Sequence, residues 1–223
     1  MVAVSNLSIN IDKLVEAIEE AKKKAKKRNF IQSVELIIKL RDVDVKKPEN
    51  RINIEVPLPN PPNEKLAKVA VFATGDLVLK AKEANADLVI GKEDLEKLAT
   101  EKRSAKELAK NYDFFIAQPD LMPIIGRYLG RYLGPRGKMP KPVPPTADIS
   151  AILARYRKSI RVRIKDQPQV MCRVGVETQD SKQIAENIEA VLEALKNKFK
   201  IPQNIERIYV KLTMGPAVEV KTK

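Results

Sequence analysis

The densest group of residues that could bind a ligand is GRYLGRYLGPRGKMPKPVPP at positions 126–145. Its four-residue repeat would place Arg127 beside Arg131, and Tyr128 beside Tyr132, along one face of a helix. Arginine and tyrosine together can pair with phosphates and stack on bases. The alternative is a helix whose tyrosines and leucines pack inward while its arginines stay in water, and we favour this alternative for the tyrosines and leucines.

The second half of this segment predicts a different structure. Its glycines and prolines indicate an irregular loop at 134–145, to which Arg136, Lys138 and Lys141 add charge. The loop is not a phosphate-binding loop of the GxxxxGK[ST] type, because that spacing is missing and no strand comes directly before it. Elsewhere, Gly75 follows an apolar run, but without a GxGxxG pattern it is weak evidence for a dinucleotide site.

A second candidate cluster is TMGP at 213–216. A strand that ends in Thr, Met and Gly exposes backbone groups, a small hydroxyl and a soft apolar side chain, which suits RNA sugar edges and 2′-hydroxyls. Taken alone, the segment is more often an ordinary tight turn. Phe30 directly follows the basic segment AKKKAKKRN at 21–29 and is either a core aromatic or a platform for stacking.

Composition favours a polyanionic partner and argues against catalysis. The 223 residues include 42 Lys and Arg against 29 Asp and Glu, a net charge of +13. There is no histidine and one cysteine, Cys172, so a Cys–His nucleophile pair, a four-ligand zinc site and an internal disulfide are excluded. We therefore expect no enzyme activity and no cofactor. No long apolar run or signal peptide is evident, so we expect a cytoplasmic protein without membrane contact.

The surrounding elements divide the chain into three parts. Periodicity predicts a helix at about 10–28 and strands at 34–40 and 51–56, before the stiff connector PLPNPP at 57–62. In the middle, short apolar runs alternate with helical patterns, which indicates a small parallel sheet covered on both faces. The last part contains a predicted hairpin of 159–165 with 170–177, a helix at 180–198, and strands at 205–212 and 217–221.

The first and last parts resemble each other in their order of elements more than either resembles the middle. We therefore predict a discontinuous α+β domain formed by residues 1–62 and 155–223, with 63–154 inserted as a second domain. The two terminal segments together contain 27 basic and 17 acidic side chains, which is +10 of the +13. If a nucleic acid binds, this split domain is its expected main site.

Two motifs and the split arrangement together resemble large-subunit ribosomal protein one, the L-one stalk family. The motifs are LGPRGKMP at 133–140 and the VKLTMGP ending at 210–216. The resemblance runs essentially end to end. It implies a split α+β domain that binds rRNA of the mobile side stalk, and an inserted α/β domain of the Rossmann-like three-layer kind. It also implies a ribosomal location, a monomer when off the ribosome, and help in releasing deacylated tRNA from the exit site. Several members repress translation of their own mRNA.

Carried over by position, the resemblance assigns RNA contact to two strand segments and, more weakly, to one turn. These residues are Phe30, Ser33, Glu35 and Lys39; Thr213, Met214 and Gly215; and Gln167 in the turn DQPQ. The alternative for Glu35 is a cross-strand partner of a basic residue. Lys138 stands where many relatives carry leucine, which leaves the role of its loop open. A rival hypothesis makes the middle domain a nucleotide-using enzyme. The missing histidine and the missing phosphate-binding motif argue against it.

Overall fold

The structure, a computed structural model, describes residues 10–201 and 203–221 and divides the chain into two compact units. The terminal unit combines the residues up to Lys65 with those from Ser159 onward, and the middle unit is Leu66–Lys158. The predicted mixture of helices and strands, with a parallel sheet in the middle of the chain, is confirmed.

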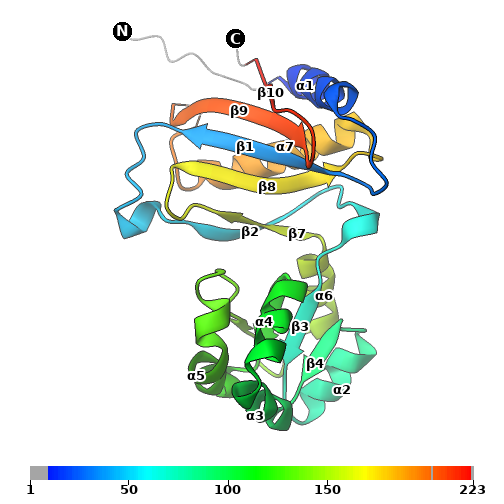
Figure 1. Ribbon diagram of the computed structural model, residues 1–223. Helices are drawn as coiled ribbons and strands as arrows, with labels where there is room; N and C mark the ends of the chain where they lie inside the picture. Colours follow the sequence, from blue (N-terminus) through cyan, green and yellow to red (C-terminus); the bar gives the residue numbers. More distant parts are fainter. Residues whose placement is uncertain (1–9, 202, 222–223) are drawn as a thin grey trace. The chain divides into compact units, whose positions relative to one another are not determined.

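The terminal unit is built on a four-stranded antiparallel sheet in the order β10-β9-β1-β8 (Figure 1). A separate two-stranded ladder joins β2 to β7. The described elements of this unit are α1 (Ile11–Lys24), β1 (Ser33–Leu40), β2 (Asn53–Pro57), β7 (Ser159–Arg163), β8 (Gln169–Val176), α7 (Ser181–Lys196), β9 (Ile205–Leu212) and β10 (Val218–Glu219), with 3₁₀ turns at Pro48–Asn50 and Asn63–Lys65.

Buried and less buried side chains alternate along β1, so the sheet has one face in the apolar core and one face toward solvent. Val34, Leu36 and Ile38 are fully buried in a core that they share with apolar residues of α1 and α7. The intervening side chains of β1 are only partly buried or exposed. Because successive side chains of a strand point to opposite faces, the second face of the sheet is left open to solvent.

The hairpin predicted from residues 159–165 and 170–177 is wrong. β7 pairs with β2 and β8 pairs with β1, so the two segments belong to different ladders. The backbone bonds of the intervening residues explain the result. Ile164 N donates to Ile52 O over 3.0 Å, and Pro168 O accepts from Leu40 N over 2.8 Å. Each end of the turn is therefore tied to a different earlier strand, which local patterning cannot reveal.

The first helix begins where predicted but ends four residues early. Asn10 caps it by accepting a hydrogen bond from Asp12 N over 3.0 Å. The prediction that it continues to residue 28 is wrong, because Ala25 is already extended and its N–H closes the last turn on Ala21 O. The basic residues 26–28 consequently lie in an exposed loop and not on a helix.

The middle unit has a four-stranded parallel sheet in the order β4-β3-β5-β6, with helices on both faces (Figure 1). One apolar core lies under α3, α4 and α5, and a second lies under α2 and α6. The elements are β3 (Val69–Phe72), α2 (Asp76–Glu83), β4 (Leu88–Ile90), α3 (Lys92–Thr100), α4 (Lys102–Asn111), β5 (Phe114–Ala117), a 3₁₀ turn at Pro119–Leu121, α5 (Met122–Leu133), β6 (Lys141–Pro142) and α6 (Ile149–Arg157).

Helix α5 contains the GRYL repeat, and the inward packing favoured for its tyrosines and leucines is confirmed. Leu129 and Leu133 are fully buried, and the half-buried Tyr128 and Tyr132 pack against the same core. The arginines of the repeat are exposed. The helical spacing thus separates an apolar face from a cationic face.

Lys138 has a structural role in the loop after α5. Its ammonium donates to Ala109 O over 3.1 Å and to Tyr112 O over 2.6 Å. These carbonyls lie at the C-terminal end of α4, where a helix leaves acceptors unpaired and where its dipole favours a cation. Lys138 therefore ties the Pro/Gly-rich loop to α4.

Cys172 provides a test of burial in the terminal unit. Burial raises the pKa of its thiol to about 12, so the reactive thiolate is scarce in the folded protein. We expect alkylation by iodoacetamide at about pH 8.5 to be on the order of a hundredfold slower than in the urea-unfolded chain. Mass spectrometry over time measures both rates. A native rate within about tenfold of the unfolded rate would contradict the packing around β8.

Candidate nucleic-acid interface

The two predicted RNA-binding segments meet at one end of the open sheet. β1 begins beside the end of β9, with Val34 opposite Leu212. Just beyond that pair, Thr213 N donates to Ser33 O over 3.0 Å, and Ser33 N donates to Thr213 Oγ1 over 3.1 Å. Residues 180 positions apart in the chain are thereby held by reciprocal hydrogen bonds.

Gln32 fixes this end of the sheet from its buried side. Its side chain is 1% exposed. The amide nitrogen donates to Lys26 O over 3.1 Å and to Glu177 Oε2 over 3.2 Å, while Oε1 accepts from Met214 N over 3.2 Å. One buried amide thus joins the basic loop after α1, the residue after β8 and the turn after β9. Because unmade bonds of buried polar groups are costly, the three segments are fixed together.

Gln32 was not among the residues predicted to form the site, although the sequence contains a signal for it. Position 32 has the same parity as the buried residues of β1 at 34, 36 and 38. A glutamine that extends a buried alternation must find partners for its amide.

The turn after β9 is tight and presents its methionine to solvent. Gly215 N donates to Leu212 O over 2.9 Å and closes the turn. A Cβ on Gly215 would lie 3.1 Å from the Cβ of Ala25, closer than ordinary carbon contacts. Glycine therefore allows the turn to approach the end of α1. Thr213 is exposed and Met214 is 56% exposed, so Met214 is not a core residue.

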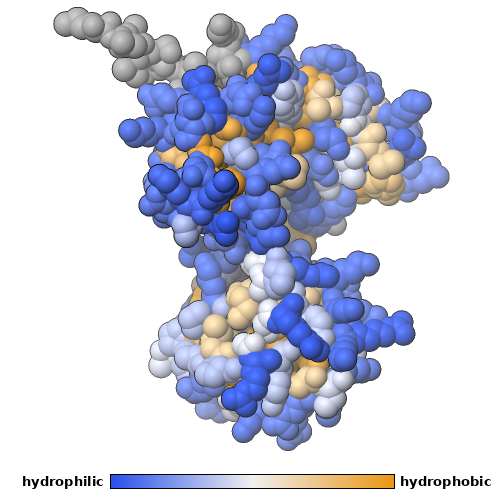
Figure 2. All heavy atoms as spheres, turned by 60° about the vertical axis from the view of Figure 1, so that its left-hand side comes forward, coloured by the Kyte–Doolittle hydropathy of each residue, from blue (hydrophilic) through white to orange (hydrophobic). Residues whose placement is uncertain are grey.

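Phe30 lies in the adjoining loop, and it too is not a core residue. It is 50% exposed, and the neighbouring Ile31 is 37% exposed. Lys26, Lys27 and Arg28 precede them and are also exposed. Figure 2 shows another face of the molecule, on which small apolar areas also lie within a largely hydrophilic surface. An exposed ring beside cations is the arrangement that stacks on bases and pairs with phosphates.

Two lysines are held against the same end of the sheet. Lys65 Nζ donates to Ile31 O over 2.6 Å and to Ser33 Oγ over 3.1 Å. Lys211 Nζ donates to Thr213 O over 3.1 Å and lies 3.5 Å from Glu35 Oε2. Glu35 is opposite Lys211 in the ladder, so the alternative of a cross-strand ion pair is realised.

Lys39 and Gln167 lie elsewhere. Six residues separate Lys39 from Ser33 along β1, a distance of about 20 Å in a strand, and Lys39 forms an ion pair with Glu206 at 2.8 Å. Gln167 is in the turn before β8 and accepts from Gln169 Nε2 over 2.7 Å. It borders a hollow of about 320 Å³ whose other lining includes Arg163 and Lys165. The structure groups the candidates near Thr213 but not these two.

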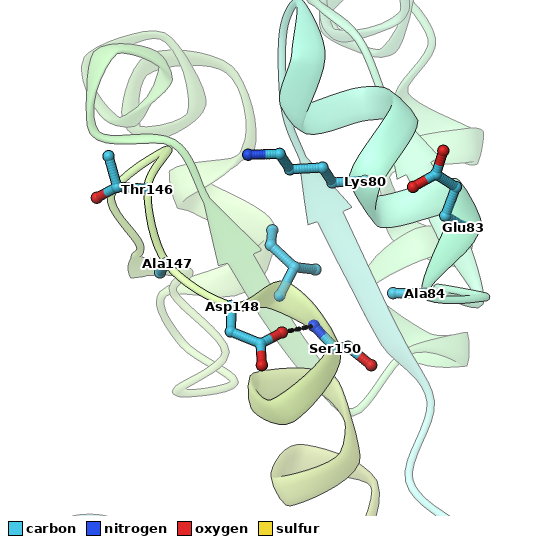
Figure 3. A pocket seen from close by; sticks show the side chains of 8 residues that line it. Lys80, Glu83, Ala84, Thr146, Ala147, Asp148 and Ser150 are labelled. Carbon is cyan, nitrogen blue, oxygen red and sulfur yellow. Dashed lines mark hydrogen bonds between the residues drawn. The ribbon is translucent and has the colours of Figure 1, made fainter.

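The middle unit has a hollow of its own, about 490 Å³, between α2 and the start of α6 (Figure 3). Lys80, Glu83 and Asp148 line it. The Asp148 carboxylate caps α6 by accepting from Ser150 N over 2.9 Å and from Ala151 N over 3.3 Å. In the described part of the chain, no three His, Cys, Asp or Glu side chains gather as metal ligands. None of the helices within 10–201 and 203–221 is long and apolar enough to cross a membrane.

Comparison with known proteins assigns the family. The sequence model of the ribosomal protein L1p/L10e family matches residues 21–216, which include both strand segments and the turn between Leu212 and Gly215. The chain belongs to the ribosomal protein L1p/L10e family. Members of this family are structural proteins of the ribosome and not enzymes, so the enzyme hypothesis fails and the expected location at the cytoplasmic ribosome is confirmed.

Relatives in this family are similar over nearly their whole length. The large ribosomal subunit protein uL1 of Thermofilum pendens is 60% identical over 208 residues, which cover 93% of this chain and 92% of that protein. The uL1 proteins of Pyrobaculum arsenaticum and Archaeoglobus fulgidus are each 50% identical over 213 residues. These matches cover 96% and 95% of this chain, and 95% and 99% of the two relatives.

The hydrogen bonds of Gln32 lead to a stability prediction for this L1-family protein. Gln32→Ala leaves Met214 N and Glu177 Oε2 without their side-chain partner, while the backbone bond from Gln32 N to Glu177 Oε1 remains. We expect a loss of about 1–3 kcal/mol in the free energy of unfolding. Urea titration measures it. Gln203→Ala, at an exposed position, is the matched control and should change stability by less than about 0.5 kcal/mol.

Hydrogen exchange separates a local effect from a general one. The Met214 amide should lose more protection in Gln32→Ala than amides in the middle of α7 do. Equal losses at both places would show that Gln32 contributes to the fold without fixing the turn.

Proposed function

We propose that this chain is a structural constituent of the large ribosomal subunit and binds rRNA of the mobile side stalk through its terminal unit. The observation that carries the proposal is the exposed turn Thr213–Gly215, bonded to the start of β1 and fixed by buried Gln32. Family membership supports RNA binding in general, and the relatives' names support the large subunit.

The groups around the turn have complementary roles toward RNA. Met214 offers a polarisable apolar side chain and Phe30 an exposed ring, which can contact sugars and bases. The exposed cations at 26–28 can pair with phosphates. Since the turn and β1 are already hydrogen-bonded to each other, little conformational entropy is lost when RNA binds. Shape and 2′-hydroxyl contacts supply specificity, and the cations supply most of the affinity.

Glu35 remains among the proposed contacts, with a defined accessory role. A carboxylate facing RNA is unfavourable unless it accepts from a base amine or a 2′-hydroxyl, or orients a cation. Its pairing with Lys211 supports the last of these. Lys39 and Gln167 would contact a different part of the RNA, about 20 Å away along the sheet.

We also propose the finer features that the resemblance implies. The residues 1–62 and 155–223 act as one RNA-binding domain, and 63–154 as an inserted Rossmann-like three-layer domain. The protein assists release of deacylated tRNA from the exit site. A messenger site that mimics the stalk would occupy the same surface and repress translation of the protein's own mRNA. Off the ribosome the protein is a monomer.

The most direct test replaces the exposed methionine. Met214→Asp puts a negative charge against phosphates and removes an apolar contact, and we expect a loss of affinity for the stalk rRNA on the order of a thousandfold. The side chain is exposed, so the thermal melt should match that of the parent. A binding titration beside the melt measures both quantities.

Two control variants distinguish an effect at the Thr213–Gly215 turn from a general effect of changing the protein's charge. Leu79→Asp makes the same kind of change at a side chain that is 60% exposed in the middle unit. Lys198→Ala removes an exposed cation after α7. Each should cost less than about tenfold in affinity. If Met214→Asp binds within threefold of the parent, the turn connects two strands and does not contact the RNA.

A shortened chain tests the proposed division of labour. The new chain joins Lys65 to Ser159 through a short Gly/Ser linker and keeps the Lys65 bonds to Ile31 and Ser33. We expect it to fold and to retain most of the free energy of binding to stalk rRNA, because it keeps both predicted RNA segments. Circular dichroism and titration check this. Tighter binding by the isolated residues 66–158 would overturn the assignment.

A further inference from the structure

The exposed face of α5 has cations that no described acidic side chain neutralises. Arg127 and Arg131 lie one turn apart on this face, and Arg136 is exposed in the loop after it. Within the described residues, Arg127 and Arg136 have no hydrogen-bond or ion-pair partner. Residues 121–147 contain five basic side chains and no acidic one. On α3 and α4, by contrast, cations alternate with carboxylates and form pairs, such as Arg103 with Glu107 at 3.1 Å.

Two glycines of α5 lie next to these arginines, and the packing of the unit does not require them. Gly126 and Gly130 lie inside the helix, where glycine costs about 1 kcal/mol relative to alanine. A Cβ on either would meet nothing within 4 Å. Gly134 differs, because its Cβ would lie 2.7 Å from Gly130 O. The packing of the unit therefore explains Gly134 but not the other two, which leave bare helix backbone beside the arginines.

Arg131, unlike Arg127 and Arg136, is held in place by a neighbouring side chain. The guanidinium of Arg131 lies 4.7 Å from the centre of the Tyr132 ring and donates to its hydroxyl over 2.6 Å. A stacked guanidinium loses less side-chain entropy when it pairs with an anion, and its planar fork matches a phosphate bidentately. One helical turn separates it from Arg127 by about 6 Å along the axis.

We propose that α5 and its following loop form a second RNA-binding surface, which takes the phosphodiester backbone of the stalk rRNA through Arg127, Arg131 and Arg136. The inference rests on the proposed function, which supplies the RNA. Charge complementarity selects a polyanion. Stalk rRNA is the expected occupant because the terminal unit, joined to the middle unit by the chain itself, raises the local concentration of that RNA. The bare backbone at Gly126 and Gly130 lets the sugar–phosphate chain come close.

The test uses the full chain and titrates stalk rRNA at several salt concentrations. The variant Arg127→Gln/Arg131→Gln/Arg136→Gln should bind at least about tenfold more weakly. Its log–log salt slope should be shallower by about 2, because each arginine–phosphate pair that is removed changes the slope by roughly 0.7–0.9. The matched control is Lys102→Gln/Lys106→Gln/Lys110→Gln, which removes the same charge from exposed positions of α4. It should stay within threefold of the parent.

A second variant keeps all the charges. Gly126→Ala/Gly130→Ala should raise the melting temperature, because alanine favours helix and finds open space, yet weaken stalk rRNA binding at least threefold. These opposite signs are not expected of residues that serve the fold alone.

Three results would overturn the inference. The first is stalk rRNA affinity within threefold of the parent in both α5 variants, and the second is an equal loss in the α4 control. The third comes from a parallel titration of deacylated tRNA, and it is a loss of affinity for the tRNA alone. The Met214→Asp variant keeps this separate from the proposed function. If Met214→Asp abolishes stalk rRNA binding and the α5 variants bind this RNA as tightly as the parent, the proposed second surface is wrong and the terminal site stands. If Met214→Asp binds normally and the α5 triple variant alone loses affinity, the terminal site is wrong and the α5 surface stands.

Discussion

A single buried amide, that of Gln32, organises the surface on which the function depends. Its partners are 6, 145 and 182 positions away in the sequence. With its hydrogen bonds in place, the loop after α1, the residue after β8 and the turn after β9 share one geometry. Phe30 and Met214 can then be exposed without being unconstrained, because the backbone around them is fixed from the buried side.

The open sheet face follows from the way in which the terminal unit forms its core. Both helices lie on the apolar side of β1, so every second residue of the strand is left for solvent or a partner. Ion pairs such as that of Glu35 with Lys211 keep this face polar. Pairs of this kind contribute little to stability, so RNA can rearrange them at small cost. The fold is stabilised on one side of the sheet, and binding takes place on the other.

Local patterns predicted most elements and few of their partners. The alternation of Val34, Leu36 and Ile38 indicated β1, and apolar runs indicated β3, β4 and β5, because these signals repeat within a few residues. The pairing of β7 with β2 was not predictable in this way. It is set by bonds such as Ile164 N to Ile52 O, between residues far apart in the chain. The early end of α1 has a similar cause, since Lys26 O bonds to Gln32.

The candidate site shows the same division. The family resemblance located Thr213–Gly215 and Phe30, but it could not tell a core aromatic from an exposed one, which depends on the packing around residue 30. Gln32 escaped attention because a glutamine at the end of a strand is ordinary unless its parity is compared with the core. Lys138 was ambiguous until its acceptors, Ala109 O and Tyr112 O, were known.

The close approach of Gly215 to Ala25 constrains how this sequence can evolve. The Cβ that any other residue would bring to position 215 lies 3.1 Å from the Ala25 Cβ, so a side chain at position 215 requires either a small shift of the end of α1 or the loss of the side chain at position 25. A lineage in which residue 215 enlarges keeps the geometry of the turn most easily if residue 25 becomes glycine first or at the same time. The two sites, far apart in the gene, are therefore coupled by selection, and the size of one residue limits the mutations accessible to the other.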